Sequence, residues 1–175
     1  MSAGIKMPAA METQPAKALP YKEIYLHPGQ MCVSREPSQI SMILGSCAGI
    51  CLFDRSKGIG GATHYMLPEW DGSGSSSNRY GDIAIDALLK QFQSFGSRAS
   101  DLEATVLGGA CMFEVFRSED GSGDHIGSRN VNLAFQIFSR LGIAIAARDT
   151  GGINGRKIKM QSDTGKVAVS IIRNS

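Results

Sequence analysis

The stretch ISMILGSCAGICLFDRSKGIGGATHYMLP, residues 40–68, contains two apolar runs that are separated by a polar turn. The first run closes with Gly45-Ser46 directly before Cys47, so we expect the thiol where a strand ends and the chain turns. His64 lies seventeen residues further on, in a second apolar run whose glycines allow a neighbouring strand to approach closely. The pattern therefore predicts two paired strands that bring the imidazole near the sulfur.

A thiol and an imidazole that converge in this way can perform nucleophilic chemistry. Proton transfer from Cys47 to His64 would give a thiolate nucleophile and an imidazolium that can protonate a leaving amine. Ser41, six residues before Cys47, offers a hydroxyl that could orient the imidazole from its far side. The alternative is structural, because a buried cysteine often serves as a small apolar group and a histidine among apolar residues often belongs to the core.

Residues 48–53 form a short apolar run that is compatible with a strand or with a short helix that begins at Cys47. The helical alternative has a chemical consequence, because a helix N-terminus lowers the pKa of a thiol placed there. Length and composition of the run do not distinguish the two, so both alternatives stay open at this point.

Six strings along the chain, taken together, carry a resemblance to a known family. They are LGSCAGICLFD, GGATHYMLP, LGGACMF, IGSRNV, DTGGINGRK and TGKV, which run from Leu44 to Val167. In this order they closely resemble the CheD family of chemoreceptor glutamine deamidases. Each string alone is a weak, glycine-containing match, so the resemblance depends on their combination.

The resemblance implies an activity and three catalytic residues. A CheD-like enzyme hydrolyses glutamine side-chain amides of methyl-accepting chemotaxis receptors to glutamate and ammonia, without a cofactor. The matching positions make Cys47 the nucleophile and His64 the group that moves protons. Ser41 is the third site residue, at a position where the family commonly has threonine. Serine keeps the hydroxyl but loses the methyl group that restricts its rotamer.

Two other functions compete with deamidation. Some members of the family bind and stimulate a CheC-type phosphatase that acts on a phosphorylated response regulator, and the two roles can coexist. The presence of both Cys47 and His64 favours catalysis, since a binding protein has no need of the pair. Metal or redox chemistry lacks support, because Cys47 and Cys51 have no second pair at zinc-like spacing and no C-x-x-C motif is present. We therefore expect no metal, with Cys51 and Cys111 packed in the core.

Length and composition set the outer limits. The 175 residues and 18.6 kDa suit one domain, which we place at residues 21–175 after a disordered leader, residues 1–20, with three prolines. The 18 basic and 16 acidic residues give a net charge of +2 without a dense basic run, so a nucleic-acid partner is not expected. Four cysteines without a signal leader or a membrane-length apolar run indicate a cytoplasmic protein that does not insert into a membrane.

The order of the remaining elements favours an α+β domain. Helices are predicted at 81–95 and at 128–141, the second capped by Ser128 and ended by Gly142. We interpret residues 69–78 as a solvated loop, with a border of the substrate entrance as the alternative, and residues 114–124 as a mobile loop. The family resemblance implies mixed β-sheets that form a sandwich flanked by two to three helices, similar to the catalytic domains of deamidating toxins. Strands are predicted at 21–27, 30–34, 39–44, 59–67, 102–107, 143–147, 157–161 and 166–172.

Overall fold

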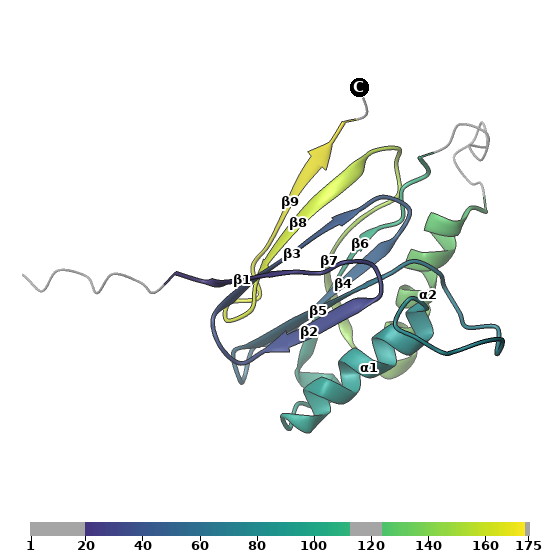
Figure 1. The fold of residues 1–175 in the computed structure, drawn as a ribbon. Coiled ribbons are helices and arrows are strands. Elements are labelled where there is room, and N and C mark those ends of the chain that lie inside the picture. Colours follow the sequence, from purple (N-terminus) through teal and green to yellow (C-terminus); the bar gives the residue numbers. More distant parts are fainter. Residues whose placement is uncertain (1–19, 113–123, 174–175) are drawn as a thin grey trace, which may run out of the picture.

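The computed structural model describes residues 20–112 and 124–173. They form two mixed β-sheets that pack face to face, together with two α-helices (Figure 1). The strand order is β1-β3-β8-β9 in the four-stranded sheet and β2-β5-β4-β6-β7 in the five-stranded sheet. This confirms the predicted α+β sandwich. The elements are β1 (Lys22–Tyr25), β2 (Gln30–Ser34), β3 (Ser38–Leu44), β4 (Ala48–Asp54), β5 (Ile59–Tyr65), α1 (Gly81–Ser94), the 3-10 turn η1 (Ala99–Asp101), β6 (Leu102–Gly108), α2 (Ile126–Leu141), β7 (Ala144–Thr150), β8 (Gly155–Gln161) and β9 (Val167–Ile172).

Two of the predicted segments fall on parts of the chain that the structure does not describe. The leader predicted at residues 1–20 and the loop predicted at 114–124 lie almost entirely outside the described residues. Within the described ranges, neither helix is long and apolar enough to cross a membrane.

The central strands β4 and β5 are buried along nearly their whole length. In β4, Ile50 and Leu52 pack against the helices, whereas Cys51 packs between the two sheets. A strand that is covered on both faces has a continuous apolar sequence rather than an alternating one, which explains why residues 48–53 were ambiguous. They form a strand, and the alternative of a helix that begins at Cys47 is wrong.

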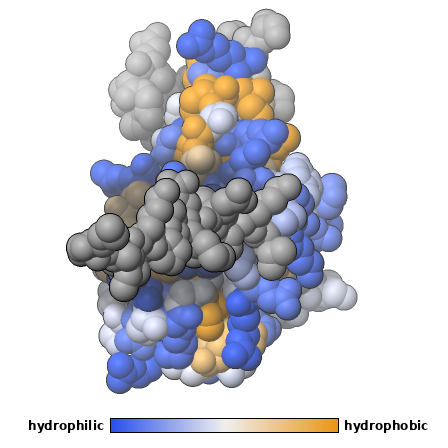
Figure 2. All heavy atoms as spheres, turned by 90° about the vertical axis from the view of Figure 1, so that its left-hand side faces the viewer, coloured by the Kyte–Doolittle hydropathy of each residue, from blue (hydrophilic) through white to orange (hydrophobic). Residues whose placement is uncertain are grey.

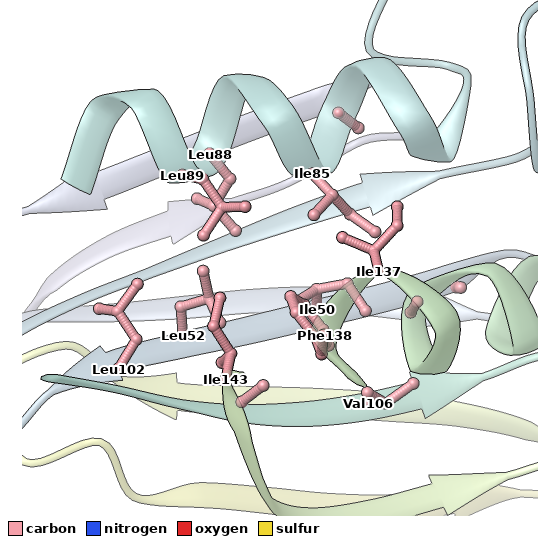
Figure 3. Packing of buried hydrophobic residues seen from close by; sticks show 14 of the residues in the cluster. Ile50, Leu52, Ile85, Leu88, Leu89, Leu102, Val106, Ile137, Phe138 and Ile143 are labelled. Atoms are coloured by element: carbon pink, nitrogen blue, oxygen red, sulfur yellow. The ribbon is translucent and has the colours of Figure 1, made fainter. Parts of the chain in front are cut away.

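Both helices cover the outer face of the five-stranded sheet, and their apolar faces complete the larger of two core clusters (Figure 1). Figure 3 shows Ile85 and Leu88 of α1 and Phe138 of α2 directed toward the β4 side chains Ile50 and Leu52. The second cluster lies between the sheets, where alternate residues of β3 are fully buried. The strict alternation in β3 means that its other residues, Ser41 among them, lie on the opposite face of that sheet.

Helix α2 begins two residues before the predicted start. Its N-cap is His125, whose Nδ1 accepts a hydrogen bond of 3.3 Å from the backbone N–H of Ser128. The predicted cap at Ser128 is wrong, because the side chain of that residue bonds back to His125 as the third residue of the helix. The predicted end is confirmed, since Gly142 adopts the left-handed conformation (φ 68°) that closes many helices.

One end of the sandwich gathers several strand termini. Strands β3, β5, β6 and β7 end there and β4 and β8 begin there, as the strand pairings require. The four-stranded sheet has no helix on its outer face in the described ranges (Figure 1). Figure 2 shows apolar residues gathered in the upper part of a mostly hydrophilic side of the molecule. The exposed isoleucines of the four-stranded sheet are Ile43, Ile171 and Ile172.

Candidate active site

Cys47 lies in the turn between β3 and β4, as predicted, and the chain after β6 holds this turn in place. The backbone N–H groups of Gly109 and Ala110 donate to the carbonyl oxygens of Cys47 (2.8 Å) and Gly45 (2.9 Å). Gly108 has a φ of 96°, and a Cβ atom on it would collide with the Cys47 carbonyl oxygen. Only glycine allows this close approach, which accounts for the Gly-Gly corner in the sequence.

A second turn, residues 149–155, supports the Gly-Gly corner from its other side. Gly151 N–H donates to the Gly108 carbonyl and Cys111 N–H donates to the Gly152 carbonyl, each at 2.9 Å. The turn is itself held by Arg156, which is 5% exposed and bonds the Asp149 carboxylate at 2.9 Å and two backbone carbonyls of the turn. The sequence predicted a structured turn here but not the buried guanidinium that organises it.

His64 lies in β5 opposite Gly49 of β4, and it is 2% exposed. Its Nδ1 is 3.1 Å from the carbonyl oxygen of Leu26. A carbonyl oxygen can only accept, so Nδ1 carries the proton and Nε2 keeps its lone pair. Within the described part of the chain, the buried Nε2 atom has no hydrogen-bond partner. Burial lowers the pKa of His64, and the charge of His27 lowers it further. The hydrogen bond to the Leu26 carbonyl raises the pKa and offsets part of this effect. The imidazole is therefore a neutral base at pH 7.

Burial raises the pKa of the Cys47 thiol above its ordinary value, and its own backbone N–H offsets only part of this effect. The thiol is therefore protonated at neutral pH. Cys47 stands directly before Ala48, where the pairing of β4 with β5 begins, and two residues before Gly49, which is opposite His64. The thiol turn and the imidazole therefore lie at the same end of the ladder. The predicted pairing of the run before Cys47 with the His64 strand is wrong, because β3 belongs to the four-stranded sheet and β5 pairs with β4, which follows Cys47, and with β2. No hydrogen bond joins Cys47 to His64 among the described residues.

We expected the Ser41 hydroxyl to orient the imidazole by direct contact, but the two groups do not form a hydrogen bond. Its Oγ donates to the Ile24 carbonyl at 3.4 Å, on the face of β3 that points away from the core between the sheets. The connection to His64 runs through backbone, because the Leu26 N–H donates to the Ser41 carbonyl at 2.8 Å and the Leu26 carbonyl bonds His64. Sequence reasoning missed Leu26, since every residue has a carbonyl and no side-chain signal marks this one.

A cavity of about 300 Å³ adjoins the Cys47 turn. Cys111 lines it and is only partly buried, so the prediction that this thiol packs in the core is wrong, whereas the prediction for Cys51 is confirmed. Residues 69–78 do not contribute to the lining. Within the described residues, no three His, Cys, Asp or Glu side chains gather as a metal site. The cavity is lined by Ser46, Ala110, Cys111, Met112, Asp124, His125, Ile126 and Arg129.

Comparisons with known proteins point to one family. Residues 66–171 match the family model described as CheD chemotactic sensory transduction. A probable chemoreceptor glutamine deamidase CheD of Sulfurimonas denitrificans is 36% identical over 155 residues, which are 89% of this chain and 97% of that protein. A protein of the same name from Trichlorobacter lovleyi is 40% identical over 148 residues, 85% of this chain and 89% of its own. The chemoreceptor glutamine deamidase CheD of Thermotoga maritima is 34% identical over 142 residues, 81% of this chain and 87% of its own.

Proposed function

The chain belongs to the CheD family, and on that premise we propose that it hydrolyses glutamine side-chain amides of methyl-accepting chemotaxis receptors to glutamate and ammonia. The observation that carries the proposal is the pairing of β4 with β5, which sets the Cys47 turn beside a buried imidazole with an unpaired Nε2. The cavity of about 300 Å³ is lined by Ser46, the residue before Cys47, but by neither Cys47 nor His64, so it offers room for receptor residues beside the thiol turn.

The reaction begins with two neutral groups. When a receptor glutamine enters, Nε2 of His64 takes the proton of Cys47, and the sulfur attacks the carboxamide carbon. Proton transfer coupled to attack suits a pair in which burial raises the pKa of the thiol and lowers the pKa of the imidazole. The Leu26 carbonyl bonds Nδ1 and stabilises the imidazolium formed in this step.

The negative charge that develops on the amide oxygen needs hydrogen-bond donors. The backbone N–H groups of Ser46 and Cys47 donate to no carbonyl among the described residues. The Ser46 N–H is available for this oxyanion, and the Cys47 N–H would turn to it from its own sulfur. His64 then gives its proton to the departing ammonia, leaving a thioester between Cys47 and the receptor. Finally, His64 takes a proton from water, the hydroxide attacks the thioester, and glutamate and the free thiol are released.

In this mechanism Ser41 acts as a positioning residue through β1. Its carbonyl accepts from the Leu26 N–H, and its hydroxyl bonds Ile24 two residues earlier. Both contacts hold the segment whose carbonyl orients the imidazole.

The test is peptide mass spectrometry of receptor fragments after incubation with the enzyme, together with an ammonia assay. Wild type is expected to convert specific glutamines to glutamate, and Cys47→Ala and His64→Ala are expected to convert none. Conversion by the Cys47→Ala variant, or none by wild type on several cognate receptors, would overturn the proposal.

Binding to a CheC-type phosphatase stays a separate prediction, since no contact in the described ranges favours it. The Cys47→Ala variant also tests this role, because a binding protein keeps its affinity for the phosphatase when the nucleophile is lost.

A further inference from the structure

Asn130 of α2 is a buried polar residue that contacts both halves of the candidate site. Its side chain is fully buried, and the amide nitrogen donates to the Ser46 carbonyl at 3.0 Å and to the Met66 carbonyl at 2.9 Å. Ser46 directly precedes Cys47, and Met66 follows His64 by two residues. One carboxamide therefore uses both of its N–H donors to join the turn that carries the thiol to the strand that carries the imidazole.

The helix that presents this amide is itself held close to the site. The hydroxyl of Tyr65, the residue after His64, donates to the Asn130 backbone carbonyl at 2.6 Å. One helical turn earlier, Gly127 packs so tightly on the backbone of Gly109 that a Cβ atom would lie 2.6 Å from the Gly109 oxygen. These contacts leave the Asn130 side chain little freedom to move away from the two carbonyls.

The cost of this arrangement indicates that the two donors matter. The other atom of the amide, Oδ1, is buried without a hydrogen-bond partner in the described part of the chain. An unpaired buried acceptor is unfavourable, and an apolar residue of similar volume would avoid it. The neighbouring helix positions Val131 and Leu133 are buried apolar residues, so the helix face itself does not demand a polar side chain.

We propose that Asn130 is a positioning residue that sets the distance between the Cys47 thiol and Nε2 of His64. The inference rests on the proposed function, in which this distance must close for proton transfer. A side chain without donors releases the Ser46 and Met66 carbonyls, and the thiol turn then loses this side-chain connection to the residues that follow His64.

The test uses the full chain with Asn130→Leu, which removes the donors without adding charge, and Asn130→Asp. Asn132, exposed and two residues further along the same helix, supplies matched controls as Asn132→Leu and Asn132→Asp. For receptor deamidation we expect the Asn130 variants to lose at least tenfold in kcat with KM changed less than threefold. The Asn132 variants are expected to keep the wild-type kcat. Thermal unfolding shows which variants are folded.

A second readout needs no receptor and therefore separates this inference from the proposed function. The rate at which iodoacetamide alkylates Cys47 is measured by peptide mass spectrometry and compared between proteins with His64 and proteins with His64→Gln. In the wild-type background this substitution is expected to slow alkylation at least threefold. In the Asn130→Leu background it is expected to have no effect, because thiol and imidazole are no longer coupled.

The outcomes are distinct. A folded Asn130→Leu variant with wild-type kcat, or one in which His64→Gln slows alkylation as much as in wild type, overturns the inference. Coupled alkylation without any receptor deamidation supports the inference and contradicts the proposed function. If both Asn130 variants unfold, Tyr65→Phe takes their place, since it removes only the hydroxyl that holds the helix. A folded Tyr65→Phe protein is expected to lose threefold or more in kcat, and an unchanged kcat overturns the inference.

Discussion

Burial keeps both side chains of the proposed catalytic pair, Cys47 and His64, neutral at pH 7. Cys47 holds its proton because burial raises its pKa, and His64 stays unprotonated because burial lowers its pKa. The site therefore differs from a preformed thiolate–imidazolium pair, in which the thiol reacts with any electrophile. In a neutral resting pair, proton transfer from Cys47 to His64 accompanies the attack on an electrophile rather than preceding it.

The depressed pKa of His64 predicts a pH dependence of stability. The unfolded chain binds a proton at His64 near pH 6.5, whereas the folded chain binds it only at lower pH. The neutral His64 therefore costs no free energy of unfolding above about pH 6.5. Below that pH the free energy of unfolding decreases, by at most about 1.4 kcal/mol per pH unit, until the pKa of His64 in the folded chain is reached. Urea unfolding at pH 7.5 and 5.5 should show a larger loss for wild type than for His64→Gln. Equal losses in the two proteins would contradict the assignment.

The contacts of Ser41 predict an intermediate effect of its removal. The Ser41 hydroxyl bonds the Ile24 carbonyl rather than the imidazole. We therefore expect Ser41→Ala to lower kcat by about tenfold or less, which corresponds to the loss of roughly one hydrogen bond that helps to position the imidazole. Ser41→Thr should retain activity. Steady-state deamidation rates measure both. If Ser41→Ala is as inactive as Cys47→Ala, the hydroxyl must reach the reacting groups directly.

At the scale of elements, α2 and the Gly-Gly corner form one packed unit. Gly127 faces the Gly109 and Ala110 carbonyl oxygens at Cβ distances of 2.6 and 2.8 Å, so the helix and the segment after β6 touch through backbone. The cavity that Ser46 lines has its other lining residues in these two elements and in the residues just before α2. Any change in their spacing changes the cavity and the turn together.

This packing predicts a strong effect of a single methyl group. Gly127→Ala must push α2 away from the corner, and we expect it to destabilise the fold by about 1–3 kcal/mol and to lower kcat/KM. In Gly155→Ala the new methyl would lie at an ordinary 3.4 Å from its nearest neighbour, so this variant serves as the stability control. Urea unfolding and deamidation assays compare the two. Equal stabilities would refute the tight packing.

The other end of β4 carries a buried carboxylate. Asp54 accepts hydrogen bonds from Ser56 and Ser97 and lies 3.8 Å from the Lys57 ammonium. Burial alone would raise its pKa, but these contacts hold the pKa below its usual value. The network closes the turn between β4 and β5 and so supports the pairing of the two strands that carry the site.

We expect Asp54→Ala to cost about 2–4 kcal/mol, because it leaves the buried Ser97 hydroxyl unpaired and removes the contacts that close the turn at Ser56 and Lys57. The exposed pair of Asp86 and Lys90 provides the comparison, where Asp86→Ala should cost less than about 0.5 kcal/mol. Denaturant unfolding measures both. The deamidation rate of folded Asp54→Ala should stay near wild type, since Asp54 lies at the end of β4 away from Cys47. A large rate loss in the folded protein would argue against that separation.

The strand at 59–67 could be predicted because an apolar run follows the polar turn at 54–58. Its pairing with β4 could not, because the short apolar run 48–53 was compatible with a strand or a helix. The α+β class followed from strand-like runs broken by two helical periodicities. Other features depend on tertiary contacts that leave no local pattern. The direction of the Ser41 hydroxyl depends on which face of β3 meets the second sheet. The role of Asn130 depends on how α2 packs against the Cys47 turn, which no pattern in the sequence indicates. The N-cap at His125 was missed because histidine is an unusual cap.

At the scale of the whole molecule, helices cover one sheet and the site lies where strands of both sheets end (Figure 1). All these contacts come from residues 20–112 and 124–173. The composition of residues 1–20 predicts a disordered leader, so a chain that begins at residue 20 should unfold within about 2 °C of the full chain and deamidate at the same rate. Differential scanning calorimetry checks the first expectation. A markedly lower Tm would mean that residues 1–19 stabilise the fold.

The most direct test of the central claim is capture of the covalent intermediate. Wild-type protein is mixed with a receptor fragment, quenched in acid within the first turnover, and digested for mass spectrometry. The mechanism predicts a thioester between the receptor glutamine carbonyl and Cys47, which disappears in His64→Ala. A thioester on Cys111, whose thiol lines the cavity, or turnover without any adduct in Cys47→Ala would contradict the account.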